Sequence, residues 1–306
     1  MISFVAKRLW SGLWTLAALI TLTFFVMRLV PGGPFSKNRK ISPEVQANIE
    51  AAFHLDEPVW RQFLRYLGGL VQGDLGPSLR FRDYSVNDLI GSGLPYSLTL
   101  GFWAILVAAA LGISLGMAGA LRRNGPVDWA TGAFGVMGIA VPIFILGPLA
   151  QLYFSLHLGL LPVSGWNDGI RSLILPVLIL ALPNVAYISR LTRSSLIESL
   201  REPHIRTARA KGIGPWRVLR AHALNGALLP VVAYLGPATA GLITGSILIE
   251  TIFALPGVGR HFVDAALNRD YPLVMGITLL YGGFLILFNI LTDITRAWMD
   301  PRLRHG

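Results

Sequence analysis

The sequence contains no cysteine among its 306 residues. Disulfide bonds, thiolate metal sites and cysteine nucleophiles are therefore all excluded. Charged residues are also scarce: they make up 14% of the chain, against about 25% in an average soluble domain. The mean hydropathy is +0.58, and long apolar runs separate the charged segments. Together these features indicate a polytopic membrane protein rather than a soluble enzyme.

The sequence also lacks the usual signatures of phosphate and zinc chemistry. A phosphate-binding loop needs Gly-Lys-Ser/Thr, but the lysines follow Ala6, Ser36, Arg39 and Ala210. The motif His-Glu-x-x-His is absent, and the 6 histidines show no metal-ligand spacing. No charge lies in the middle of an apolar run, because Arg28, Glu250 and Asp293 stand near the ends. We therefore expect no enzyme, no metal, no cofactor in this chain, and no proton-coupled carrier.

Six apolar runs are long enough to cross a bilayer, and they predict an all-α fold of six transmembrane helices. The runs cover about 9–30, 97–121, 129–156, 173–189, 227–249 and 273–292. Basic residues gather in alternate connections, which places both termini and the loop after residue 189 in the cytoplasm. We expect kinks at Pro142 and Pro148. Gly112-x-x-x-Gly116 and Gly241-x-x-x-Gly245 are expected to be helix-packing faces.

The region 31–94 is hydrophilic with balanced charge, as suits an external segment. It carries three helix-start signals, at Ser42-Pro43-Glu44, at Asp56-Glu57-Pro58 and at Ser85, and a turn at 73–77. The second helix places Val59, Phe63, Leu67 and Leu70 along one stripe, and Ser85 is expected to cap a short piece through Ile90. This region is interpreted as a helical cap on the membrane surface or as a docking surface for an external partner, and the two are compatible.

The segment Arg190–Pro230 concentrates the positive charge of the chain, with eight Lys or Arg and two Glu up to Arg220. After Glu202-Pro203 we expect a short helix, 205–211, ended by Gly212 with a positive φ. Gly214-Pro215 then opens a second helix toward the fifth span. The resulting knob, 205–224, is predicted to seat in a partner, with Ala208 and Ala210 permitting close approach. The simpler alternative is a basic loop that only orients the protein.

Mild polar residues also occur inside the spans, and most are expected to form hydrogen bonds between helices. They are Asn184, Tyr187, Tyr234, Thr239, Thr244, Ser246 and Asn289. A subset on the last two spans is the candidate lining of a neutral, water-filled path: Thr244, Ser246 and Asn289.

Thr207-Ala208-Arg209-Ala210-Lys211-Gly212, followed by His222-Ala223-Leu224 and Leu228-Leu229-Pro230, resembles the cytoplasmic loop of ABC importer permeases of the peptide type. The resemblance extends over nearly the whole chain. It includes the motifs 28–34, 55–58, 73–76, 85–90, 250–253, 256–259 and 269–272, and B-type subunits of oligopeptide permeases are the most similar. The broader ABC pattern has Glu-Ala-Ala where this chain has Arg206, Thr207 and Ala208, so the contact known for that Glu is not carried over.

The resemblance implies a type I ABC importer permease fold with a helical external insertion after the first span. Four parts are expected. They are the cytoplasmic N-terminus with the first transmembrane helix (1–30), a periplasmic helical region (31–94), a five-helix permease core (95–295) that contains the cytoplasmic coupling loop 190–226, and a cytoplasmic tail (296–306). The implied partners are a homologous C-type permease subunit, two cytoplasmic ATPases that bind ATP and Mg²⁺, and a periplasmic peptide-binding protein. The residues implied to contact the ATPase are Arg206, Thr207, Ala208, Arg209, Ala210, Lys211, Gly212 and Gly214.

Two alternatives remain at this point. The same machinery could import nickel or another small solute, because the permeases for those solutes share most of the motifs. A protein of a different class, a membrane receptor or membrane enzyme, would need no ATPase partner.

Overall fold

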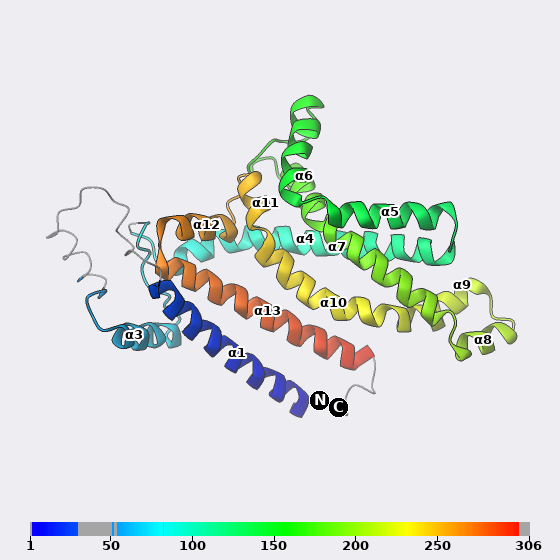
Figure 1. Ribbon diagram of the computed structural model, residues 1–306, viewed down its shortest axis with the longest axis horizontal. Helices are drawn as coiled ribbons and strands as arrows, with labels where there is room; N and C mark the ends of the chain where they lie inside the picture. Colours follow the sequence, from blue (N-terminus) through cyan, green and yellow to red (C-terminus); the bar gives the residue numbers. More distant parts are fainter. Residues whose placement is uncertain (1, 30–50, 52–53, 82, 300–306) are drawn as a thin grey trace.

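The computed structural model describes residues 2–29, 51, 54–81 and 83–299. Long helices run along one direction (Figure 1): α1 (Ile2–Leu29), α4 (Val86–Leu121), α5 (Pro126–Ala140), α7 (Ile170–Ser199), α10 (Leu224–Gly245) and α13 (Tyr271–Met299). Shorter elements lie between them: α3 (Val59–Val71), α6 (Ile143–Ala150), the π-helical η1 (Gln151–His157), α8 (Pro203–Ala210), α9 (Pro215–Val218), the π-helical η2 (Leu219–Ala223), α11 (Ile247–Ile252) and α12 (Val258–Asn268). No strand occurs in the described residues.

The all-α membrane architecture expected from the sequence is confirmed. Five helices in the described part are long and apolar enough to cross a bilayer, and a sixth span results if α5 and the α6–η1 pair count as one. That third span is not straight, because its two halves meet at 99°. Pro142 caps α6 at this bend, which confirms the predicted kink, whereas Pro148 lies inside α6 without interrupting it.

The helix bundle has two ends, which we call the basic end and the opposite end. The basic end holds the α4–α5 turn, α8 and α9, together with the first turns of α1 and the last turns of α13 (Figure 1). The opposite end holds α3, α12 and the start of α13. At the basic end, Arg8 of α1 pairs with Asp293 of α13 at 3.1 Å, so these helices are antiparallel neighbours.

Ser85 starts the longest helix of the chain. Its side chain accepts a hydrogen bond from the Asp88 backbone, and the Asp88 carboxylate accepts one from the Ser85 backbone at 3.0 Å. This reciprocal capping box opens α4 itself. The expectation of a short separate piece through Ile90 is therefore wrong, because nothing stops the helix before Leu121.

Glycines bring α4 and α7 into backbone contact. A Cβ at Gly112 would lie 2.7 Å from the Cβ of Ile188, and one at Gly116 would lie 2.5 Å from the Ser189 carbonyl oxygen. The predicted packing role of Gly112 and Gly116 is thus confirmed. The same role predicted for Gly241 and Gly245 is wrong within the described chain, because nothing lies within 4 Å of a Cβ at either position.

A buried carboxylate organises the opposite end of the bundle. Glu250 is 1% exposed. It accepts hydrogen bonds from Ser97 of α4 at 2.7 Å, from Ser246 at 2.5 Å and from the Gly259 backbone at 2.7 Å. A charge buried without partners costs several kcal/mol, so these donors make the position tolerable. They also tie α4, α11 and the first turn of α12 together.

Asp270 plays a similar role at the start of α13. It is fully buried, and its carboxylate accepts from the backbone of Leu273 at 3.3 Å, which caps the helix. The same carboxylate accepts from the Ser78 hydroxyl and from the Leu79 backbone. The segment 78–80 is therefore attached to α13 although about 190 residues separate them.

The helix predicted after Asp56-Glu57-Pro58 is confirmed as α3, and the turn at 73–77 is confirmed by positive φ at Gly73 and Gly76. The expectations for Pro31-Gly32-Gly33-Pro34, for Ser42-Pro43-Glu44 and for the tail beyond Met299 lie outside the described residues.

The α4–α7 contact gives a stability prediction. Gly116→Leu forces α4 away from α7 and is expected to destabilise the protein by about 1–3 kcal/mol. The matched control is Gly132→Leu in α5, where nothing lies within 4 Å of the added Cβ. Thermal unfolding in detergent should show a lower Tm for Gly116→Leu only, and equal Tm values would contradict the contact.

Candidate functional site

The knob begins as a continuation of a span. Residues Arg190–Ser199, expected to be the start of the loop, belong to α7. A helix of 30 residues is about 45 Å long, which exceeds the hydrocarbon thickness of about 30 Å. The last turns of α7 therefore project beyond the spanning part and carry α8 and α9 at the basic end (Figure 1).

The short helix of the knob is α8, and its two ends are set by Pro203 and Gly212. Pro203 occupies the first helical position, so α8 starts two residues before the expected Ile205. At its end Gly212 has φ +75°. The Gly212 backbone donates to Arg209 and the Ile213 backbone donates to Ala208, which is a Schellman motif. The predicted glycine stop is confirmed.

One face of α8 packs on the chain itself. Ile205 and Ala208 are buried in a cluster with Leu196 of α7 and with Val218 and Leu219 of the following turns. The expectation that Ala208 faces a partner is wrong in this structure, because its side chain is only 5% exposed and lies among these residues. A small side chain is needed there to bring α8 close to its own supporting helices.

The other face of α8 is open. It comprises Arg206, Thr207, Arg209, Ala210, Lys211 and Gly212, and the adjacent Gly214 is exposed as well. Trp216 lies beside it and is 63% exposed, with the Arg220 guanidinium 5.9 Å from its ring centroid. A surface of several cations around an exposed aromatic ring suits a protein partner.

The second helix of the knob runs directly into the fifth span. Gly214 precedes α9, Pro215 is its first residue, and the π-helical turn η2 joins it to α10. The predicted helix 216–224 is thus divided between three elements without a break in the chain's helical path. The Ser199 hydroxyl donates to the Ala223 carbonyl at 2.8 Å and fastens the end of α7 to this turn.

An ion pair holds the base of the knob. Arg193 of α7 donates from two nitrogens to the carboxylate of Asp128 at 2.5 and 2.8 Å, and the Asn124 backbone donates to the same carboxylate. Bidentate hydrogen bonds between arginine and a carboxylate are among the strongest hydrogen bonds in proteins. These contacts fasten the α4–α5 turn to α7.

The candidate pathway residues have different environments. Thr244 lies partly exposed on α10, between the exposed Gly241 and Gly245, and Asn289 is partly exposed on α13. Ser246 is fully buried and donates to Glu250. Its assignment to a pathway lining is therefore wrong in this structure. Of the expected bonds between helices, the Tyr234 hydroxyl donates to Asn184 at 2.7 Å, joining α10 to α7.

The described residues hold no catalytic arrangement at this site. The segment 112–116 matches Gly-x-Ser-x-Gly, but it lies inside the continuous helix α4 and serves packing. A nucleophile elbow needs a sharp turn between a strand and a helix. The arrangement is instead mechanical: an exposed basic face on a short helix, supported by apolar contacts to two long helices.

The missed contributors are Ile205, Asp128 and Arg193. The burial of Ile205 and Ala208 could have been predicted from the sequence, because residues three apart lie on the same face of a helix. No local pattern pairs Asp128 with Arg193, because 65 residues separate them.

Comparisons with known proteins agree with this geometry. A family profile described as binding-protein-dependent transport system inner membrane component matches residues 89–305, and the corresponding N-terminal profile matches residues 1–79. The chain is 48% identical to the oligopeptide transport system permease protein OppB of Haemophilus influenzae and 47% identical to OppB of Escherichia coli K12, with both chains fully covered. It is 42% identical to the dipeptide transport system permease protein DppB of Bacillus subtilis, over 99% of this chain and 98% of that one.

Solved structures show the same fold at low identity. The inward-facing MetNI methionine ABC transporter matches with a TM-score of 0.56 at 19% identity, covering 69% of this chain and 96% of that one. An amino acid ABC transporter crystallised with histidines matches with a TM-score of 0.54 at 17% identity, covering 69% and 94%. The expected type I importer permease fold is confirmed.

The two faces of α8 can be distinguished by chemical labelling, since the chain has no native cysteine. Ala210→Cys places a thiol on the exposed face, whereas Ala208→Cys places one in the buried cluster. A water-soluble maleimide applied to the isolated, detergent-solubilised chain should label Ala210→Cys at least tenfold faster, because only that thiol meets solvent. Equal labelling rates would show that α8 is not docked on its own chain.

Proposed function

The chain belongs to the family of binding-protein-dependent transport system inner membrane components, and we propose that it is the transmembrane subunit of an ABC importer for oligopeptides. It is a multi-pass protein of the inner membrane. The assignment of oligopeptides as the substrate rests on the 47–48% identity, over the full chain, to oligopeptide permease subunits. Permease subunits of this family are not catalytic themselves.

An oligopeptide is favoured over nickel as the substrate. Among the described residues no group of three or more His, Cys, Asp or Glu could hold a metal ion. The exposed side of α10 carries Thr244 between two glycines and is electrically neutral. A neutral path tolerates chemically varied side chains, whereas metal recognition needs fixed ligands.

Four partners complete the proposed transporter. A homologous C-type permease subunit forms the other half of the path, two cytoplasmic ATPases bind ATP and Mg²⁺, and a periplasmic protein delivers the peptide. In this arrangement the basic end faces the cytoplasm, with both termini on that side. The excess of Lys and Arg in the knob supports this orientation.

The exposed face of α8 is the proposed contact with one ATPase. Arg206, Arg209 and Lys211 supply charge, Ala210 and Gly212 permit close approach, and Trp216 supplies apolar area. Since Ile205 and Ala208 fix α8 to the ends of α7 and α10, a displacement of α8 moves both long helices as rigid bodies. ATP-driven closure of the ATPases would thereby switch the path between its two accessible sides.

The opposite end receives this motion. The helix α10 leads to Ser246 and Glu250, and Glu250 holds α4 and the start of α12. A displacement of α10 would therefore also move α4 and α12 at the opposite end, where the peptide-delivering protein would dock. The knob transmits motion and has no part in ATP hydrolysis itself.

Deletion of the gene tests the substrate class. The deletion strain should fail to grow on di- to hexapeptides as the only source of a required amino acid, while nickel uptake continues. Complementation with the intact chain restores growth. A strain that keeps peptide uptake but loses nickel uptake would contradict the oligopeptide assignment.

Gly212 tests the coupling role. Gly212→Val places a branched side chain at φ +75°, which costs about 1–2 kcal/mol and loosens the end of α8. We expect peptide uptake to fall at least tenfold while the complex still assembles and hydrolyses ATP. The measurement is the number of ATP molecules hydrolysed per peptide transported in reconstituted vesicles.

A matched control separates coupling from general backbone strain. Gly159 also has a positive φ, +62°, and nothing lies within 4 Å of an added Cβ. Gly159→Val carries a comparable local cost far from the knob and should transport with normal stoichiometry. Normal stoichiometry in Gly212→Val would refute the coupling role of α8.

A further inference from the structure

Arg28, at the end of α1, is a half-buried cation whose hydrogen-bond partners among the described residues are all neutral. Its Nε and Nη2 donate to the Gln62 side-chain oxygen at 3.1 and 2.8 Å, and its Nη1 donates to the Phe24 carbonyl at 3.3 Å. The guanidinium carbon lies 3.5 Å from the centroid of the Phe24 ring. No carboxylate in the part of the chain that the structure describes forms an ion pair with it.

The surrounding residues hold Arg28 in one position. The Gln62 amide nitrogen donates to the carbonyls of Leu55 and Glu57, so this side chain cannot turn away. Phe24 is fully buried against Phe63 and Tyr66 of α3. A partly desolvated charge is costly unless an opposite charge meets it. The fixed guanidinium therefore indicates a site for an anion.

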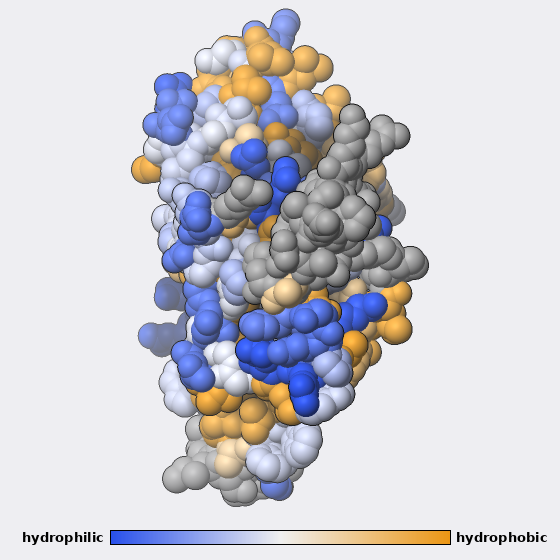
Figure 2. All heavy atoms as spheres, turned by 90° about the vertical axis from the view of Figure 1, so that its left-hand side faces the viewer, coloured by the Kyte–Doolittle hydropathy of each residue, from blue (hydrophilic) through white to orange (hydrophobic). Residues whose placement is uncertain are grey.

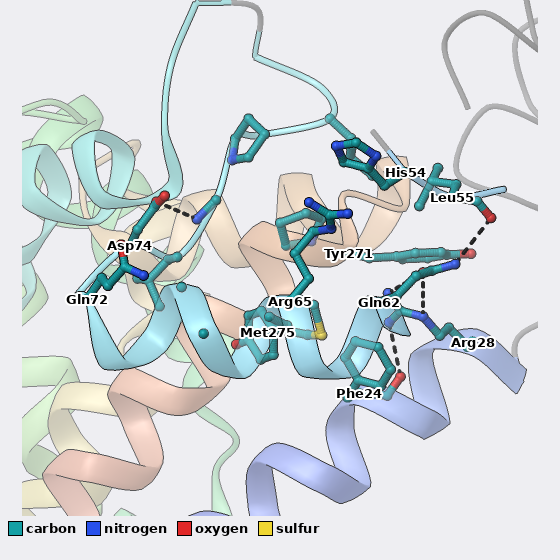
Figure 3. A pocket seen from close by; sticks show the side chains of 18 residues that line it. Phe24, Arg28, His54, Leu55, Gln62, Arg65, Gln72, Asp74, Tyr271 and Met275 are labelled. Carbon is teal, nitrogen blue, oxygen red and sulfur yellow. Dashed lines mark hydrogen bonds between the residues drawn. The ribbon is translucent and has the colours of Figure 1, made fainter. Parts of the chain in front are cut away.

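A cavity of about 580 Å³ opens beside Arg28, between α1, α3 and the start of α13. Figure 3 shows side chains from all three helices pointing into it, among them Phe24, Arg28, Gln62, Arg65, Tyr271 and Met275. The polar part of the lining holds Arg28 and Arg65, the latter paired with Glu57, and also the carboxylate of Asp74, whereas the other part is apolar. Burial raises the pKa of Tyr66 to about 12, although nearby Arg28 lowers it, so the hydroxyl stays protonated and able to donate.

A second, very small pocket of about 10 Å³ lies between α1, α3 and α13. It shares Tyr66 and Met275 with the cavity and is further lined by Leu19, Ile20, Thr23, Thr278 and Leu279. Leu19 precedes Arg28 by nine residues, a distance of about 14 Å along the helix. This is about half of the 30 Å hydrocarbon thickness. The contact between α1 and α13 thus extends to roughly the middle of a bilayer, but the pocket of about 10 Å³ within it has no room for an acyl chain.

The neighbouring surfaces are suited to lipid. On α1 the side chains of Leu22, Val26 and Leu29 are exposed. On α3 a separate stripe of Trp60, Leu64 and Val71 is exposed, and these three share one helix face. Hydrophilic atoms gather at the level of α3 on the opposite end of the molecule, with apolar atoms directly beside them (Figure 2). Such a boundary is typical of a membrane–water interface.

We propose that the cavity between α1, α3 and α13 binds the headgroup of one outer-leaflet phospholipid, with its phosphate on Arg28 and an acyl chain along the exposed apolar side chains of α1. Arginine is well suited to phosphate because its fork of N–H groups matches the phosphate oxygens. The bound lipid fastens α3 to the two helices beneath it. Neither a free anion nor an acidic side chain of a partner would use the exposed apolar side chains of α1 beside the cavity.

The test uses the purified full transporter in mild detergent and native mass spectrometry, with phosphatidylglycerol as the probe. Wild type should retain one phospholipid more than Arg28→Gln, whose affinity should fall about tenfold, the loss expected for a charge-assisted hydrogen bond. The matched control is Arg80→Gln, since Arg80 is an exposed arginine at the same end and does not line the cavity. Equal retention by wild type and Arg28→Gln would overturn the proposal.

A second variant tests the cavity without changing charge. Gly68 lines the cavity, and nothing lies within 4 Å of an added Cβ, so Gly68→Leu fills the space without a clash. It should lose the retained lipid, whereas Gly91→Leu, an equally unobstructed position in α4, should keep it. Retention by Gly68→Leu equal to wild type would overturn the assignment of the headgroup to this cavity.

Inorganic phosphate separates the two sources of the anion. Addition of 10 mM phosphate, roughly the level at which a weak anion site fills, should leave the retained lipid in place, because the acyl chain contributes to its binding. Displacement of the lipid by phosphate alone would show a free-anion site and overturn the proposal. Assembly with the ATPase subunits, checked for each variant, confirms that the tested protein is intact.

Discussion

The close approach of α4 and α7 is the contact on which the rest of the structure depends. Glycine at positions 112 and 116 lets the two backbones meet without intervening side chains. Because hydrocarbon offers no hydrophobic drive between helices, such close packing is the main source of helix association in a membrane. It fixes the direction of α7, and α7 in turn carries α8 beyond the spanning region. The position of the knob therefore depends on the packing of two glycines that lie far from it.

Buried polar groups fasten the two ends of this framework. At the basic end Asp128 and Arg193 join the α4–α5 turn to α7. At the opposite end Glu250 and Asp270 collect donors from segments distant in sequence. Each carboxylate has enough hydrogen bonds to offset its burial. The ionisable groups that hold the helices together thus lie at the two ends, whereas glycine contacts and the neutral Tyr234–Asn184 hydrogen bond join the helices between them.

The remaining surfaces divide according to what they contact. Apolar side chains of α1 and α3 are exposed, and the proposed lipid site is the cavity beneath α3 that contains Arg28. The exposed face of α8 is cationic and is the proposed contact with an ATPase. The glycines at positions 241 and 245 leave a smooth strip on α10 that nothing in the described chain covers, which is consistent with a second permease subunit and a shared path.

Sequence alone determined what depends on composition and local pattern. Hydropathy fixed the number of spans, charge asymmetry set the expected orientation, and the glycine and proline positions marked the ends of α8, because these are properties of a residue and its near neighbours. Tertiary structure decided the rest. It turned Ala208 inward, placed Ser246 against Glu250, bent the third span by 99°, paired Asp128 with Arg193 and set Arg28 against Phe24 and Gln62. Each of these outcomes depends on which distant helix packs nearby, and local periodicity carries no information on that choice.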